Sequence, residues 1–81
     1  MTRHKIEKRV NNILMDGLLV RKELIKPEAD LVNDLGLDSL DMTELRSCID
    51  KKFGIDVKSD YSNIETIKDL YDFVEEKAKN K

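Results

Sequence analysis

Apolar residues near the start of the chain recur at the spacing of one helix face. They are separated by four, three and one residues, with charged and amide side chains between them: Ile6, Val10, Ile13 and Leu14. This pattern predicts an amphipathic helix over about 3–16, with Gly17 as its left-handed stop. The apolar residues between 18 and 33 are scattered and keep no period, which predicts a long packed connection. Long connections in small domains tend to be functional.

A second helical pattern begins at Asp38. The side chain of Asp38 is placed to cap a helix, and Asp41 lies three residues on, where a capping-box partner is expected. The inward stripe that follows consists of Met42, Leu45, Ile49 and Phe53. Gly54 and the apolar Ile55 then form a helix-ending signature. The pattern therefore predicts a helix over about 38–53.

The last helical pattern is the most clearly amphipathic, and Thr66 is its expected cap. Its apolar face consists of Ile67, Leu70, Tyr71, Val74 and Ala78. Before it, residues 59–64 leave room for only a short turn of helix, and no stretch alternates for long enough to form a strand. We therefore expect an all-α fold, a small bundle of three main helices and one short helix, with Phe53, Tyr71 and Phe73 added to an aliphatic core.

Composition limits what such a chain can be. It has 81 residues, 40% of them hydrophobic and 40% charged, which fits one folded domain spanning 1–81. No apolar run reaches the ~18 residues of a membrane span, and residues 1–26 have no signal-peptide core, so we expect a cytoplasmic protein without a membrane span. One cysteine, Cys48, and one histidine, His4, exclude an internal disulfide and the usual zinc clusters, so no metal site is expected.

The net charge of −2 hides a gradient along the chain. Residues 1–26 carry seven basic and three acidic side chains, a balance of +4, whereas residues 27–81 carry eight basic and fourteen acidic ones, a balance of −6. One stretch contains acidic residues without any Lys or Arg among them: Glu28, Asp30, Asp34, Asp38, Asp41 and Glu44. Such a stretch repels phosphate backbones and attracts basic protein surfaces, so nucleic acid is not an expected partner.

The chain offers little for catalysis. A nucleophilic serine or cysteine needs a base, and His4 lies where a helix start would fray, so we expect no enzymatic activity. Ser39 stands out instead, because it directly follows the expected cap Asp38. Its hydroxyl would lie beside unpaired N–H groups and the positive end of the helix dipole, where a phosphate ester is favourably placed. Serine is also common at helix starts for capping reasons alone.

The stretch Asp34–Asp41 reads Asp-Leu-Gly-Leu-Asp-Ser-Leu-Asp and is followed by Glu44-Leu45. It resembles the phosphopantetheine attachment motif of acyl carrier proteins, whose core is Asp-Ser-Leu at the start of the second helix. The order of the predicted elements is similar over nearly the whole chain. The resemblance implies that a separate phosphopantetheinyl transferase esterifies Ser39 with 4′-phosphopantetheine donated by coenzyme A. The thiol at the end of that arm, and not Cys48, would carry the acyl group.

The resemblance also implies a setting. It implies a carrier for fatty-acid or related biosynthesis, polyketide-like or specialised lipid pathways included, that works with acyl-loading and condensing enzymes. Within such carriers, the Gly-Leu-Asp-Ser string favours an acyl or small aminoacyl load over a peptidyl one, on a free-standing protein that we expect to be a monomer. Two alternatives stay open: a carrier of D-alanyl or other aminoacyl groups, and a small helical interaction module without a prosthetic group, in which Asp38 is only a cap.

Partner recognition is expected along the helix that starts at Ser39. In the family, basic patches on partner enzymes bind acidic residues beside the serine, and the corresponding residues here are Asp38, Asp41 and Glu44. The outward face of the helix differs from that of typical fatty-acid carriers, which keep apolar and then acidic residues there; here it consists of Leu40, Thr43, Ser47 and Lys51, followed by Lys52. We therefore expect dedicated partners that differ from general fatty-acid synthesis enzymes and present an acidic or neutral patch opposite Lys51; the alternative is drift on a surface that tolerates substitution.

Overall fold

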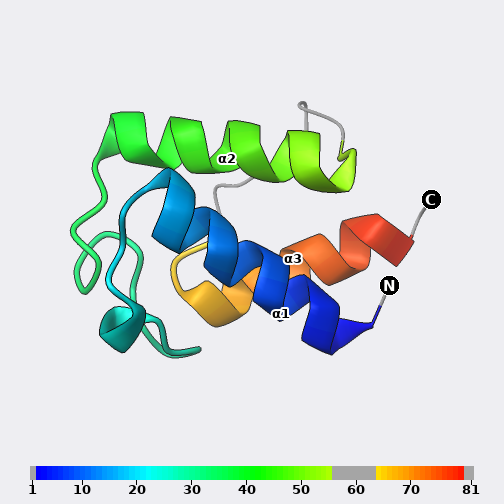
Figure 1. The fold of residues 1–81 in the computed structure, drawn as a ribbon, viewed down its shortest axis with the longest axis horizontal. Helices are drawn as coiled ribbons and strands as arrows, with labels where there is room; N and C mark the ends of the chain where they lie inside the picture. The colour runs from blue at the N-terminus through cyan, green and yellow to red at the C-terminus, as the bar shows by residue number, and fades with distance from the viewer. Residues whose placement is uncertain (1, 56–63, 80–81) are drawn as a thin grey trace.

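The computed structural model describes residues 2–55 and 64–79, with side chains as far as Lys77, and shows a helical protein (Figure 1). Its elements are α1 (Arg3–Asn12), the π-helical turn η1 (Ile13–Gly17), the 3₁₀ turn η2 (Lys22–Leu24), α2 (Ser39–Phe53) and α3 (Ile67–Lys79). The three main helices match the three that the sequence predicts. Residues 56–63, which include most of the predicted short helix over 59–64, lie outside the described part of the chain. The β structure of the described ranges consists of one isolated antiparallel bridge between Asp30 and Thr66.

The first helix begins at Thr2, whose hydroxyl accepts the N–H of Lys5 at 3.4 Å. It widens into η1 at its end, so the helical path runs to Gly17, close to the predicted limit. The predicted left-handed stop at Gly17 is wrong, because the residue with a positive φ is Leu19, at 58°. The wider turn takes Gly17 into the helix, and the chain reverses at Leu19, after which the Val20 N–H donates to the Leu14 carbonyl at 2.9 Å.

The connection from α1 to α2 is packed, as the sequence predicts. Ala29, Leu31 and Leu37 are buried in the core. Its middle is tied to the start of α3, because the Leu31 N–H donates to the Glu65 carbonyl at 2.8 Å and the Ile67 N–H donates to the Ala29 carbonyl at 3.0 Å. The long connection is therefore held by backbone hydrogen bonds as well as by apolar contacts.

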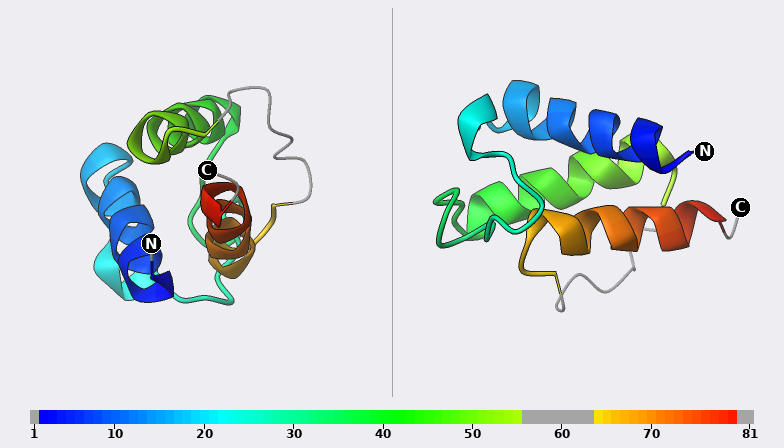
Figure 2. Two further views of the ribbon diagram at one scale, coloured as in Figure 1. Left: turned by 90° about the vertical axis from the view of Figure 1, so that its right-hand side faces the viewer. Right: turned by 90° about the horizontal axis from the view of Figure 1, so that it is seen from below.

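The core lies between the three helices, which surround a common centre when viewed end-on (Figure 2). Its fully buried large side chains come from every helix and from the connection: Ile6, Leu14, Leu31, Leu45, Ile49, Ile67, Leu70, Val10 and Val74. Phe53 and Tyr71 are buried as predicted, and Phe73 packs against the core while half-buried. The side chain of Ala78 lies outside the described set. Helix α1 runs opposite to α2 and α3, so α2 begins at the end of the molecule away from both termini (Figure 1).

No helix in the described ranges is long and apolar enough to cross a membrane.

Candidate functional site

Ser39 is the first residue of α2 and is exposed to solvent. Asp38 precedes it in an extended conformation, with φ −100° and ψ −173°, so the chain turns into the helix directly at the serine. Thr43 donates its hydroxyl to the Ser39 carbonyl at 3.0 Å, a hydrogen bond that does not involve the Ser39 side chain. Within residues 2–55 and 64–79 the Ser39 hydroxyl has no hydrogen-bond partner.

A capping box closes the start of α2. The Asp38 carboxylate accepts the Asp41 N–H at 2.9 Å, and the Asp41 carboxylate accepts the Asp38 N–H at 3.2 Å. Each carboxylate therefore bonds backbone at the helix start, as the sequence predicts. No group in the described part of the chain accepts the N–H groups of Ser39 and Leu40, which point out of the helix start with the positive end of its dipole.

The loop from Asp30 to Asp38 is anchored to the core and so fixes the position of Ser39. Leu37 is buried, and its N–H donates to the carbonyl of the buried Leu31 at 3.1 Å. Gly36 has a φ of 71°, in the left-handed region that glycine enters without the steric cost other residues meet. A Cβ at Gly36 would meet nothing within 4 Å, so the requirement for glycine lies in the backbone and not in space. The Asp34 carboxylate accepts the Asp30 N–H at 2.7 Å, a bond that stabilises the turn from Asp30 to Asp34 just before Gly36.

The residues predicted for partner recognition form one exposed strip along α2. Leu40 is 79% exposed, and the polar members of the strip are exposed as well: Thr43, Glu44, Ser47 and Lys51. Asp41 is half-buried because it takes part in the capping box. At about 1.5 Å of rise per residue, Ser47 lies about 12 Å and Lys51 about 18 Å along the helix from Ser39. The structure thus gathers Asp38, Leu40 and Asp41 at the serine and places the other members progressively farther away.

A small hollow of about 180 Å³ opens between α2 and the start of α3. It is lined by Met42, Thr43, Leu45, Arg46, Ile64 and Leu70. Helical periodicity places Met42, Leu45 and Leu70 on inward faces. It does not predict that Arg46 and Ile64 line the same hollow. Ile64 reaches the hollow because the chain before α3 returns beside α2, which is a matter of tertiary packing that no local pattern records.

The other chemically reactive side chains lie away from Ser39. His4 is exposed in the first turn of α1, and Cys48 is half-buried on the flank of α2, as its helical position predicts. Across the described residues, no three His, Cys, Asp or Glu side chains are grouped so that they could hold a metal ion.

Comparison of the sequence with those of known proteins identifies the family that it matches. The family described as "Phosphopantetheine attachment site" matches residues 8–74 of the chain. The chain is 44% identical to an acyl carrier protein of Nitratidesulfovibrio vulgaris (strain DP4) over 73 residues, which cover 89% of this chain and 96% of that relative. It is 42% identical to the acyl carrier protein of Coprothermobacter proteolyticus over 76 residues, 93% of each chain.

A third relative, the acyl carrier protein of Syntrophobacter fumaroxidans, is 40% identical over 74 residues, which cover 90% of this chain and 88% of the relative. The family match from 8 to 74 contains the whole of η1 and α2, the connection between them and the first part of α3. The similarity therefore extends through the fold and is not confined to one short motif.

Proposed function

This chain belongs to the acyl carrier protein family, and on that premise we propose that it carries acyl groups as thioesters on a 4′-phosphopantetheine arm esterified to the Ser39 hydroxyl. The observation that carries the proposal is the place of Ser39 at the first position of α2, where its exposed hydroxyl makes no hydrogen bond to any described residue. When bound, the arm supplies a terminal thiol that forms the thioester. The chain itself supplies a fixed attachment point.

The residues around Ser39 fit a phosphodiester. The N–H groups of Ser39 and Leu40 lie at the positive end of a helix of 15 residues and have no acceptor in the described ranges, and a phosphate on the hydroxyl would lie next to them. The neighbouring carboxylates of Asp38 and Asp41 are held against backbone N–H groups, which offsets part of their repulsion toward an added phosphate. The serine faces solvent, so an arm attached to it can swing toward partner enzymes.

The proton of the Ser39 hydroxyl must be removed when the ester forms. Asp38 and Asp41 are engaged in the capping box, and His4 lies in the first turn of α1, at the end of the molecule opposite the start of α2. We therefore propose that a separate phosphopantetheinyl transferase supplies the base and binds coenzyme A. The Ser39 oxygen would attack the phosphorus that bears the pantetheine, the phosphoanhydride bond of coenzyme A would break, and adenosine 3′,5′-bisphosphate would leave. In this division of labour the chain is a substrate and a carrier and not an enzyme.

The hollow between α2 and α3 would shelter the first carbons of an attached acyl chain. Thr43, which lines it, is one helical turn from Ser39 and bonds the Ser39 carbonyl. Met42, Leu45 and Leu70 give the hollow apolar walls, and burying acyl carbons there gains about 0.8 kcal/mol per CH₂ group.

We propose fatty-acid or related biosynthesis as the setting, with a transferase, acyl-loading enzymes and condensing enzymes as partners. Basic patches on those partners would meet Asp38, Asp41 and Glu44, and the strip from Leu40 to Lys51 would select among them. The alternative of an interaction module without a prosthetic group is not favoured, because the matched family is described by its phosphopantetheine attachment site.

Intact-mass measurement tests the proposal. The purified chain is incubated with coenzyme A and a promiscuous phosphopantetheinyl transferase, and we expect its mass to rise by one phosphopantetheinyl group. A mass that does not change, while a known carrier in the same reaction is modified, would overturn the proposal.

A further inference from the structure

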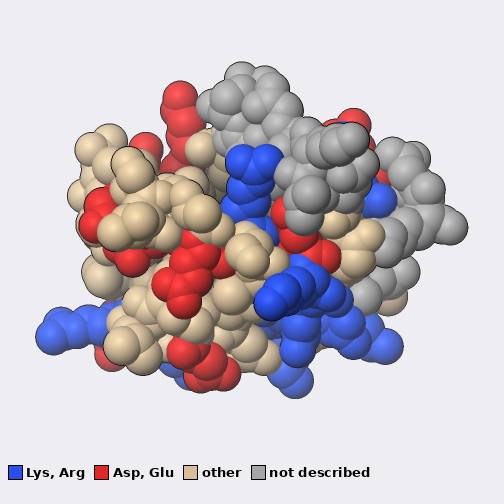
Figure 3. Space-filling model, turned by 90° about the horizontal axis from the view of Figure 1, so that it is seen from above, with Lys and Arg blue, Asp and Glu red and all other residues tan. Residues whose placement is uncertain are grey.

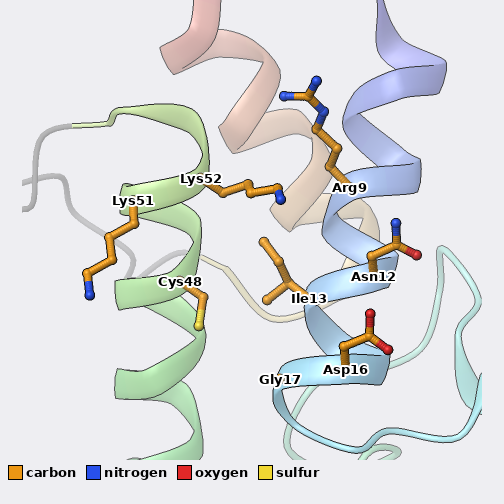
Figure 4. Close-up of a pocket in the computed structure, with 8 residues that line it drawn as sticks. All are labelled: Arg9, Asn12, Ile13, Asp16, Gly17, Cys48, Lys51 and Lys52. Carbon is orange, nitrogen blue, oxygen red and sulfur yellow. The ribbon is translucent and has the colours of Figure 1, made fainter.

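A groove runs between α1 and the end of α2, away from Ser39, and its lining shares Lys51 with the strip proposed for partner recognition. One hollow of about 500 Å³ lies between η1 and α2, and its lining residues are shown in Figure 4. A second hollow of about 590 Å³ continues along α1. The two share Arg9, Asn12 and Lys52, so they form one continuous groove.

Cations surround this groove. We use the name basic groove for the two hollows, with four cations and two floor residues as the defining members: Lys5, Lys8, Arg9, Ile13, Cys48 and Lys52. The side chain of Lys52 extends from α2 toward α1, whereas Lys51 turns away to the outer side of α2 (Figure 4). Basic atoms gather at the lower right of Figure 3, where α2 ends beside α1, and much of the acidic surface in that view lies to the left.

The cations of the basic groove are not paired within the described residues. Their charge is therefore available to a ligand, since Lys5, Lys8, Arg9 and Lys52 make no ion pair with any residue in 2–55 or 64–79. Arg3 on the same helix shows the contrast. It pairs with Glu7 at 3.0 Å, Asp72 at 2.8 Å and Glu75 at 3.3 Å, which ties α1 to α3.

The floor of the basic groove is apolar. The Ile13 and Cys48 side chains point toward each other across the space between the helices (Figure 4), and the backbone of Gly17 leaves room beside them, with the Cys48 sulfur 3.9 Å from where a Cβ would stand. Ile13 is 9% exposed and Cys48 is half-buried, so the floor is a shallow apolar surface beneath charged walls. Among the described residues, Asp16 is the one carboxylate that lines the first hollow, and it marks the end of the groove away from the lysines of α1.

We propose that the basic groove binds an acidic segment of a partner protein, with an apolar side chain on the Ile13 and Cys48 floor and carboxylates facing Lys8, Arg9 and Lys52. Charge complementarity selects an acidic occupant, and the concave shape selects an inserted segment. A lipid surface is met by protruding apolar side chains beside cations, whereas this apolar floor is recessed. Lys52 lies about 20 Å along α2 from Ser39, so a segment bound here leaves the serine open.

The binding of a short synthetic peptide of repeated Asp-Glu-Leu triplets tests the proposal. We expect the peptide to shift the backbone amide NMR signals of Arg9, Asn12, Cys48 and Lys52 in the full chain. Reversal of two wall charges, Lys8→Glu with Lys52→Glu, should weaken binding at least about tenfold. The matched pair Lys22→Glu with Lys26→Glu makes the same change of net charge at exposed positions outside the groove, and should weaken binding less than about twofold.

Further measurements distinguish the possible occupants of the basic groove. A peptide with serine in place of leucine should bind more weakly than the parent, because it offers no apolar side chain to the floor, and equal binding would overturn the role proposed for that floor. Equal losses from the two charge-reversal pairs would overturn the proposal, as would binding to vesicles containing anionic phosphatidylglycerol without binding to the peptide. Concentration-dependent self-association that accounts for the same amide shifts would overturn it too, because the occupant would then be a second copy of the chain. Both double variants carry changes at exposed positions, and circular dichroism establishes that they fold.

Discussion

Asp38 and Asp41 bond each other's backbone, carboxylate to N–H in both directions, at 2.9 and 3.2 Å across the start of α2. Both carboxylates are also proposed to meet basic patches on partner enzymes. The same two carboxylates thus cap the helix that carries Ser39 and supply negative charge beside it for recognition by partners. A substitution at either one changes stability and recognition together, so the two effects need separate tests.

The first prediction concerns the contribution of this capping box to the free energy of unfolding. Asp41→Ala removes the acceptor for the Asp38 N–H and should lower the free energy of unfolding by about 1 kcal/mol. Asp41→Asn keeps an oxygen acceptor without the charge and should lose less. Denaturant unfolding of the three proteins gives both values. Equal stability of Asp41→Ala and the native chain would show that the capping box contributes nothing.

The second prediction isolates recognition by charge. Glu44 is exposed and lies outside the capping box, so Glu44→Lys should slow arm transfer by the transferase without a measurable change in stability. Raising the salt concentration should slow transfer to the native chain and narrow the gap between the two proteins.

A matched control for Glu44→Lys is Glu76→Lys, which makes the same change of charge at an exposed position on α3. Its transfer rate should stay close to that of the native chain. If both variants slow transfer equally, net charge and not a local patch controls the reaction, and the recognition role of Glu44 is refuted.

The third prediction concerns the outward strip of α2. Thr43, Ser47 and Lys51 are exposed there and reduce the apolar and acidic surface that a general fatty-acid condensing enzyme would meet. With an acyl or malonyl load, the native chain should be turned over poorly by such an enzyme. Turnover should improve in the triple variant Thr43→Val, Ser47→Met and Lys51→Glu. Turnover of the native chain equal to that of the enzyme's own carrier would refute a specialised partner.

The fourth prediction concerns pH and the start of α3. Asp69 accepts the N–H groups of Thr66 and Glu65, both at 3.1 Å, and these backbone hydrogen bonds hold the pKa of the Asp69 carboxyl below its ordinary value. A lowered pKa stabilises the fold above the unfolded-state pKa of about 4, and the contribution disappears as pH falls through the folded-state value. Asp69→Asn should therefore reduce the loss of stability below about pH 4. Identical acid-unfolding curves for the two proteins would contradict this.

Local sequence signals account for the parts of the structure that depend on local backbone chemistry. Asp38, Asp41 and Gly54 set the limits of α2 because capping acts within one helical turn, and Gly36 adopts its left-handed φ where the loop must turn. The apolar stripes likewise place Leu45 and Leu70 in the core, because helical periodicity decides which face can be buried.

The features that the sequence misses come from packing between distant segments. At the end of α1 a wider helical turn absorbs Gly17, so Leu19 takes the left-handed position that residue type alone would assign to glycine. Arg46 and Ile64 line one hollow, and Arg9 and Lys52 share another, because helices far apart in the sequence lie side by side. No periodicity within one helix contains that information.

The central claim is that Ser39 is the attachment point, and its most direct test compares intact masses of two serine variants after reaction with coenzyme A and a promiscuous transferase. Ser39→Ala should fold with a loss well under about 1 kcal/mol, because the position is exposed and alanine favours helix, and its mass should not change. Ser47→Ala, two turns farther along α2, should gain one phosphopantetheinyl group as the native chain does. A gain of that group by Ser39→Ala would contradict the account.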